Sequence, residues 1–318
     1  MELSVLREKI GAVKANVEKV IIGKGKEIDL VLTALLAKGH ALLEDVPGTG
    51  KTALAKSLAK SLDCSFKRVQ FTPDLLPSDL TGLNFYNPKT GEFTFRRGAL
   101  FTSVLLADEI NRATPRTQSG LLESMEERQI TIDGESYPLG SPYFVIATQN
   151  PIETQGTFPL PEAQLDRFCI QLSLGYPGTE EGIAIIRRFV QDDPVVSLSP
   201  VCTGAEIAQM QEEVKTVAIH PDVLRYIMDL TERTRGHEKA LLGVSPRGSI
   251  MLARAAQSYA ALKGRAFVTP DDVKLLLPYV YGHRIILRTG AGDKTARVTQ
   301  LLSEISAAVT APTENWGK

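Results

Sequence analysis

The sequence is poor in cysteine and lacks an excess of charge of either sign, and each shortage excludes a class of protein. Its 318 residues include three cysteines, Cys64, Cys169 and Cys202, which are too few and too widely spaced for a disulfide framework. The four histidines show no zinc-ligand spacing with one another or with the cysteines. The formal net charge is −1, so the overall balance does not predict nucleic acid or an anionic membrane as a partner.

Long apolar runs are also missing. No stretch approaches the roughly 20 apolar residues of a membrane span, and residues 1–4 do not begin a signal peptide. We therefore expect a cytoplasmic protein without a membrane span. The composition, 43% hydrophobic and 23% charged, is typical of a globular protein, and the length favours about two domains.

The most informative stretch follows an apolar strand predicted at residues 40–44. Residues 45–52 read Asp-Val-Pro-Gly-Thr-Gly-Lys-Thr and lead into an amphipathic helix that extends to about residue 62. A strand that enters a helix through such a turn directs unpaired N–H groups and a positive dipole end at one point, which suits a phosphate. Lys51 is predicted to reach the β- and γ-phosphates, and the Thr52 hydroxyl to bind Mg²⁺.

The phosphate-binding loop supplies the predicted nucleotide contacts, which are Val46, Pro47, Gly48, Thr49, Gly50, Lys51, Thr52 and Ala53. One position departs from the P-loop pattern, because Asp45 stands where that pattern has its first glycine. The alternative is a glycine-rich turn before an ordinary helix.

Polar residues follow two further buried strands, predicted at 103–107 and 143–147. Ligands of open α/β sheets lie outside the carboxyl ends of the strands. Asp108 is therefore predicted to hold the hydration shell of Mg²⁺, and Glu109 to orient the attacking water. The alternative is an acidic N-cap for the helix at 115–127. Asn150 is predicted to contact the γ-phosphate or the attacking water, or else to form a turn before proline.

The order of elements predicts an α/β fold, a parallel sheet flanked by helices, followed by a helical part. Helices at 4–20 and 27–37 precede the first strand, strands at 66–71 and 169–174 extend the sheet, and hairpins are predicted within 72–101 and at 129–139. Beyond about residue 193 the sequence shows no strand-like run, and helices are predicted at 204–214, 221–234, 246–263 and 270–281. We predict a nucleotide-binding core at 1–193 and a small all-helical domain at 194–318.

Arg247 falls in the first turn of the helix at 246–263. A cation is unfavourable beside the positive end of a helix dipole unless an anion lies there. Arg247 is therefore a candidate nucleotide contact, and a solvated surface arginine is the alternative.

Five stretches, in the same order along the chain, resemble the MoxR family of AAA+ ATPases. They are residues 71–82 (FTPDLLPSDLTG), 105–112 (LLADEINR), 147–151 (ATQNP), 159–168 (PLPEAQLDRF) and 243–248 (GVSPRG). The resemblance covers nearly the whole chain. It implies roles for seven residues: Lys51 and Thr52 as Walker A, Asp108 and Glu109 as Walker B, Asn150 as sensor 1, Arg247 as sensor 2, and Arg167 as the arginine finger.

The resemblance also implies an activity and partners. It implies an AAA+ P-loop NTPase core with hairpin inserts and a helical lid, which binds ATP and Mg²⁺ between the subunits of a homo-oligomer, a hexameric ring. The implied role is chaperone-like remodelling or maturation of partner proteins, which often carry von Willebrand factor A-type domains.

Two other function classes are compatible with these motifs. The first is a nucleic-acid-remodelling AAA+ motor of the related helicase and chelatase branch, although the sequence lacks a basic stripe. The second is a non-catalytic nucleotide switch, which does not need a water-orienting carboxylate such as Glu109.

The insertion at 72–101 is the predicted working surface. It places Phe85 and Tyr86 in a turn-rich segment, and aromatic residues of this kind are enriched in the energetic centres of protein interfaces. The alternative is that both side chains pack the insertion onto its own core.

Overall fold

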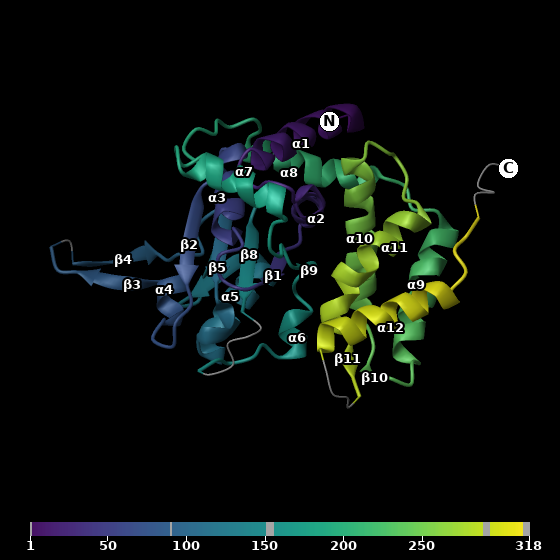
Figure 1. The fold of residues 1–318 in the computed structure, drawn as a ribbon. Helices are drawn as coiled ribbons and strands as arrows, with labels where there is room; N and C mark the ends of the chain where they lie inside the picture. The colour runs from purple at the N-terminus through teal and green to yellow at the C-terminus, as the bar shows by residue number, and fades with distance from the viewer. Residues whose placement is uncertain (1, 90, 151–155, 289–292, 314–318) are drawn as a thin grey trace.

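A computed structural model describes residues 2–89, 91–150, 156–288 and 293–313. Thr90 of the predicted hairpin turn and Pro151 of the ATQNP stretch lie outside these ranges. The centre of the fold is a parallel sheet with the strand order β2-β5-β8-β1-β9 (Figure 1). Its strands are β1 (Ala41–Glu44), β2 (Phe66–Gln70), β5 (Val104–Asp108), β8 (Phe144–Gln149) and β9 (Ile170–Leu172).

Helices cover both faces of this sheet, as its nearly continuous apolar strands require. Successive strand residues point to opposite faces. Leu43 and Leu106 therefore join the hydrophobic cluster under one set of helices, whereas Leu42 and Leu105 join a second cluster under α5. The first set contains α1 (Leu3–Glu18), α2 (Gly25–Leu36) and α3 (Lys51–Ser61), and α5 spans Pro115–Glu127.

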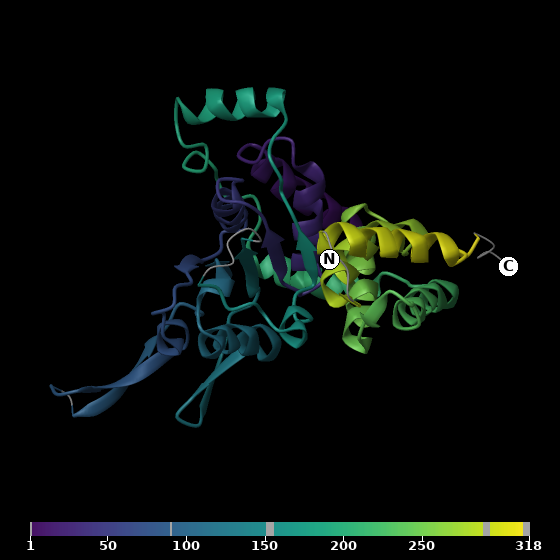
Figure 2. The same ribbon diagram turned by 60° about the horizontal axis from the view of Figure 1, so that its bottom comes forward.

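Two antiparallel hairpins extend from one side of this core (Figure 2). The first consists of β3 (Gly82–Asn87) and β4 (Glu92–Arg97) after the short α4 (Pro77–Thr81), and the second of β6 (Gln129–Ile132) and β7 (Glu135–Pro138). The Phe95 and Tyr137 rings stack with centroids 4.3 Å apart, and Asn84 donates to Asp133 at 2.7 Å. The two predicted hairpins therefore support each other.

The C-terminal part is mainly helical, as the sequence predicts. Its elements are α8 (Gly204–Glu213), η2 (Val214–Thr216), α9 (Pro221–Arg235), α10 (Pro246–Leu262), α11 (Pro270–Tyr281), η3 (Gly282–Arg284) and α12 (Lys294–Ala308). The expectation of no strand here needs correction, because β10 (Ala240–Leu242) and β11 (Ile286–Leu287) form an antiparallel ribbon. Each strand is too short to produce an alternating pattern in the sequence.

The core contains three further short elements, η1 (Ile110–Arg112), α6 (Glu162–Leu165) and α7 (Thr179–Phe189).

The C-terminal helices pack directly on the N-terminal ones. One hydrophobic cluster includes Val13 of α1, Leu32 of α2 and Ala256 of α10. The boundary predicted between residues 193 and 194 stays a prediction, since this cluster contains residues from both sides of it.

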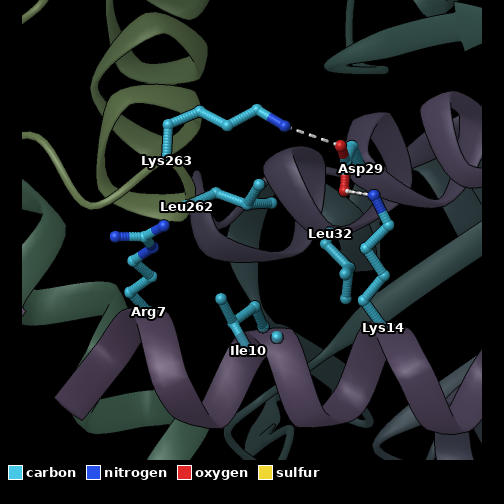
Figure 3. A pocket seen from close by; sticks show the side chains of 8 residues that line it. Arg7, Ile10, Lys14, Asp29, Leu32, Leu262 and Lys263 are labelled. Carbon is cyan, nitrogen blue, oxygen red and sulfur yellow. Dashed lines mark hydrogen bonds and ion pairs between the residues drawn. The ribbon is translucent and has the colours of Figure 1, made fainter. Parts of the chain in front are cut away.

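A cavity of about 240 Å³ lies where α1, α2 and α10 meet (Figure 3). In its wall, the buried Asp29 carboxylate pairs with Lys14 at 2.7 Å and with Lys263 at 2.8 Å. Because Lys263 follows α10 and Asp29 belongs to α2, this triad fastens the C-terminal helices to the N-terminal ones.

Within the ranges that the structure describes, no helix is long and apolar enough to cross a membrane.

The buried His40 should make the stability of the folded protein depend on pH. Its Nδ1 accepts from the Val145 amide at 3.0 Å, its Nε2 lies 3.1 Å from the Met125 carbonyl, and burial lowers its pKa to about 3. Below pH ~6.5 the unfolded chain takes up a proton that folded His40 resists. The free energy of unfolding should therefore fall by up to about 1.4 kcal/mol per pH unit between pH ~6.5 and ~4 because of this group.

Urea denaturation at several pH values measures this slope. His40→Gln should make the slope shallower, whereas His220→Gln, at a partly exposed position, is the matched control. Equal slopes in wild type and His40→Gln would contradict the assignment.

Candidate nucleotide-binding site

The phosphate-binding loop joins β1 to α3 and has the backbone that its glycines permit. Gly48 and Gly50 have φ angles of +86° and +92°, in the left-handed region where residues with a side chain are strained. The loop then opens into the N-terminus of α3, whose first turn carries unpaired N–H groups. Lys51 Nζ donates to the carbonyls of Asp45 and Val46 at 2.9 and 3.0 Å. The chain thus forms a cradle of donors that suits a phosphate.

Asp45, the departure from the P-loop pattern, has a structural role. Its buried carboxylate accepts from the Ser173 hydroxyl at 2.7 Å and from the amides of Leu174 and Gly175 at 2.6 and 3.1 Å. These bonds tie the start of the loop to the segment after β9. A glycine could not make them, so the aspartate suits this fold better than the pattern's glycine.

A cavity of about 410 Å³ brings most of the predicted site together. Its walls come from the phosphate-binding loop, from the ends of β2, β5 and β8, and from the residues that follow these strands. It is lined by Pro47, Gly48, Gly50, Lys51, Thr52, Ala53, Arg68, Asp108, Glu109, Thr148, Gln149 and Asn150. Val46 and Thr49 belong to the loop without lining this cavity.

The two carboxylates are held by neighbours that the sequence analysis missed. Asp108 accepts from the Thr148 hydroxyl and from Arg68 Nη2, both at 2.6 Å. Glu109, with a φ of +55°, accepts from the side-chain Nε2 of Gln70 at 2.7 Å. Neither carboxylate caps α5, whose N-cap is Thr114, so the capping alternative is wrong.

Register explains these contacts. β2 pairs with β5 so that Gln70 lies opposite Asp108, and alternate residues of β2 therefore face the carboxylates. The alternating sequence of β2 predicts that Arg68 and Gln70 point to the same side. Only the strand order shows that β2 lies beside β5 and its carboxylates.

The donor set at the cavity fits Mg²⁺. The Thr52 hydroxyl and the Asp108 carboxylate are hard oxygen ligands, which this ion prefers. No group of three or more His, Cys, Asp or Glu side chains within the described ranges forms a metal cage. Mg²⁺ commonly keeps waters and substrate phosphates as its remaining ligands, so a complete protein cage is not needed.

The two predicted arginines meet elsewhere, on one carboxylate. Arg167 Nε donates to one oxygen of Glu126 at 2.9 Å, and Arg247 Nη2 donates to the other. The hydrogen bond from Arg167, assisted by the charge of Arg247, lowers the pKa of Glu126. Neighbouring contacts fix the pair, since Asp166 accepts from Ser245, the N-cap of α10, at 3.0 Å.

The parallel sheet separates this arginine pair from the phosphate-binding loop of the same chain. Arg167 comes just before β9, whose first residue, Ile170, pairs with Ala41 at the start of β1. The loop follows Glu44, at the end of β1. Because the strands are parallel, the arginines lie at the amino ends of the strands and the loop lies at their carboxyl ends. We call these two sides of the molecule the arginine edge and the phosphate-binding edge. Within one chain, the structure does not bring them together.

Comparisons with known proteins agree with this geometry. Residues 40–170 match the family model of the ATPase family associated with various cellular activities (AAA), and residues 232–305 match the AAA lid domain. The chain is 39% identical to Chaperone MoxR1 of Mycobacterium tuberculosis, over 86% of this chain and 74% of that protein. It is 32% identical to Protein MoxR of Paracoccus denitrificans, over 86% and 87%.

The chain belongs to the MoxR family of AAA+ ATPases. It is also 47% identical to the uncharacterized protein YeaC of Bacillus subtilis, over 96% of this chain and 95% of that protein. The crystal structure of a protein assigned as an ATPase from Cytophaga hutchinsonii superimposes with a TM-score of 0.90 at 36% identity, covering 98% and 97% of the two chains. The predicted MoxR family and AAA+ fold are therefore confirmed.

Proposed function

We propose that this MoxR-family chain hydrolyses ATP with Mg²⁺ at sites shared between neighbouring copies of itself in a hexameric ring. One observation carries this proposal: Arg167 and Arg247 are held together at the sheet edge opposite Lys51. A second copy that places its arginine edge against this phosphate-binding edge would complete the site. Such a head-to-tail contact uses two different surfaces, which is the contact that closes a ring.

Each residue then has a task that follows from its place. The N–H groups of the loop and Lys51 bind the phosphates, and Thr52 and Asp108 would hold Mg²⁺. When bound, Mg²⁺ would neutralise charge on the phosphate oxygens. Glu109 orients the attacking water, and Asn150 contacts that water or the γ-phosphate.

The arginines belong to the neighbouring copy. Arg167, as arginine finger, and Arg247 would face the phosphates across the interface. There they would stabilise the negative charge that spreads over the transferred phosphoryl group.

The work that ATP hydrolysis drives is proposed to be chaperone-like remodelling or maturation of protein clients. A relative of this chain is named a chaperone, and von Willebrand factor A-domain proteins are the clients that the family resemblance suggests. The net charge of −1 does not favour a nucleic-acid track. Cytoplasmic localisation stays a prediction.

The β3–β4 hairpin is the proposed client surface. Phe85 and Tyr86 are 42% and 55% exposed, and the Tyr86 ring packs on its hairpin neighbour Phe93, at 5.5 Å between centroids. The alternative that both aromatics pack into the core is therefore wrong. Exposed aromatics on a projecting arm are available to a partner.

Replacing Phe85 and Tyr86 with alanine should abolish client stimulation of the ATPase. Basal turnover should stay near wild type, and the free energy of unfolding should change by less than about 0.5 kcal/mol, because both side chains are exposed. The assay measures phosphate release with and without a protein captured on the Glu109→Gln variant. Phe267→Ala, an exposed aromatic on the C-terminal part, is the matched control.

The same assay tests the nucleic-acid alternative. Stimulation by duplex DNA with a steep salt dependence, and by no protein, would favour a nucleic-acid motor instead.

A further inference from the structure

Helix α7 (Thr179–Phe189) is strongly amphipathic, yet it does not bury its apolar side. All of its residues are described, and none is buried. Amphipathic helices of globular proteins normally turn the apolar stripe to the core. In Figure 2, α7 stands apart from the sheet and its covering helices. This exception requires an explanation.

The side of α7 that faces its own chain is held by charged residues at both of its ends. Glu181 lies against Gly23, so closely that a side chain at Gly23 would collide with it, and Arg188 donates to the Lys19 carbonyl. Residues 181, 184, 185 and 188 form one stripe at helical spacing, in which Ala184 and Ile185 lie between the charged Glu181 and Arg188. Polar contacts therefore fix which side of α7 faces out.

The outward side is apolar. Ile183, Ile186 and Val190 follow the spacing i, i+3, i+7, and Phe189 lies beside them. These four side chains, the α7 stripe, are between 44% and 78% exposed. Four large apolar side chains on one helix face form a patch of the kind that marks protein contacts.

The α7 stripe stands at the phosphate-binding edge of the molecule. The segment from β9 to α7 is bonded to Asp45 at the start of the loop, and Lys24 Nζ donates to the Tyr176 carbonyl at 3.1 Å. Ile21, in the same turn as Lys24, lies beside Gly50 of the loop. Any protein that closes over the nucleotide cavity at this edge therefore approaches α7.

Exposed apolar side chains also lie on α10 and on β10, the strand that precedes α10 in the chain. Ile250 lies one helical turn after Arg247 on α10 and is 53% exposed, and Leu241 and Leu242 of β10 are 62% and 53% exposed. We name these three side chains the lid patch. The α7 stripe thus accompanies the phosphate-binding half of the proposed site, and Ile250 of the lid patch accompanies the arginine half.

We propose that the α7 stripe of one copy packs on the lid patch of the next copy, and that this contact aligns Arg167 and Arg247 with the neighbour's phosphate-binding loop. The inference rests on the proposed shared site and names the surface that assembles it. Charge favours the same orientation, because two arginines would meet a surface that holds Asp108, Glu109 and the nucleotide phosphates. The stripe and the lid patch differ, as a head-to-tail interface requires.

The first test introduces charges into the α7 stripe and measures whether the protein still assembles. Ile186→Glu with Val190→Glu should raise the protein concentration for half-assembly with ATP at least about tenfold, measured by sedimentation velocity, because charges would be buried at the interface. Leu224→Glu with Met228→Glu, on the exposed side of α9, is the matched control and should assemble like wild type. Far-UV circular dichroism and melting temperature should match wild type in both variants.

The second test asks which surfaces meet. Because each copy offers its stripe to one neighbour and its lid patch to the other, Ile186→Glu combined with Ile250→Arg in one chain should recover assembly. A pair of single variants, Ile186→Cys and Ile250→Cys, should cross-link between copies when mixed and oxidised. Cross-linking of Ile186→Cys with itself would overturn the proposal in favour of a two-fold contact.

Failure of this inference differs from failure of the proposed function. Normal assembly of the Glu double variant while wild type hydrolyses ATP overturns only the α7 contact. If wild type does not assemble at any concentration, with or without ATP, the contact and the shared site are both overturned. If wild type binds vesicles of anionic phospholipid and the Glu double variant does not, the stripe serves a membrane surface and the proposal is wrong.

Discussion

Glu109→Gln should slow ATP turnover by at least about 10²-fold and leave ATP binding largely intact. The amide has nearly the size of the carboxylate, so the loop, Thr52 and Asp108 keep their places. What is lost is the negative charge that we propose orients the attacking water. Phosphate release measures turnover, and equilibrium titration with a fluorescent ATP analogue measures binding.

The matched comparison is Lys51→Ala, which removes a proposed phosphate contact and should weaken binding itself. Chelating Mg²⁺ with EDTA should stop turnover in wild type, since Thr52 and Asp108 are proposed to hold that ion. Unchanged turnover in purified Glu109→Gln protein would contradict the role proposed for this residue. If the protein were instead a non-catalytic switch, the wild type itself would bind ATP tightly and show no turnover.

Mixing two inactive variants should restore activity if the site is shared. Arg167→Ala copies keep an intact phosphate-binding loop, and Lys51→Ala copies keep an intact arginine. In a randomly mixed ring, about one interface in four joins an intact loop to an intact arginine, so up to about a quarter of wild-type activity should return. Each variant alone should be strongly impaired, because arginine fingers contribute about 10³ to 10⁵ in rate where they have been measured.

The control for this experiment is Arg116→Ala, at an exposed position on α5, because Glu126 pairs with Arg167 and Arg247 instead. It should behave like wild type alone and in mixtures. Turnover per chain should also rise with protein concentration as copies associate. The shared site is contradicted if mixing restores nothing, or if turnover per chain is the same where the protein is strictly monomeric.

The sequence by itself indicated the elements whose signals are local. Glycines at 48 and 50, followed by Lys51 and Thr52, predict a phosphate-binding turn because only particular residues tolerate that backbone and that helix start. The apolar run before Asp108 predicts a buried strand, since a strand covered on both faces has no polar side. The five MoxR-like stretches indicated the family, which the comparisons confirm.

Local signals failed where the environment overrides composition. Helix α7 went unpredicted although its apolar spacing is regular, because the segment follows the turn-forming Gly175, Pro177 and Gly178. The ribbon β10–β11 has too few residues for a period. Asp45 looked like a departure from a motif, because its three hydrogen-bond donors lie about 130 positions further along the chain.

Only the tertiary structure decided how the site is divided. Strand order places Arg68 and Gln70 beside Asp108 and Glu109, although no local pattern links these residues. Parallel pairing of β1 with β9 puts Arg167 at the edge opposite Lys51. The sequence therefore named the chemical groups, because each residue type carries its own chemistry. Which groups can act on one nucleotide depends on contacts between distant segments, and these exist only once the sheet has formed.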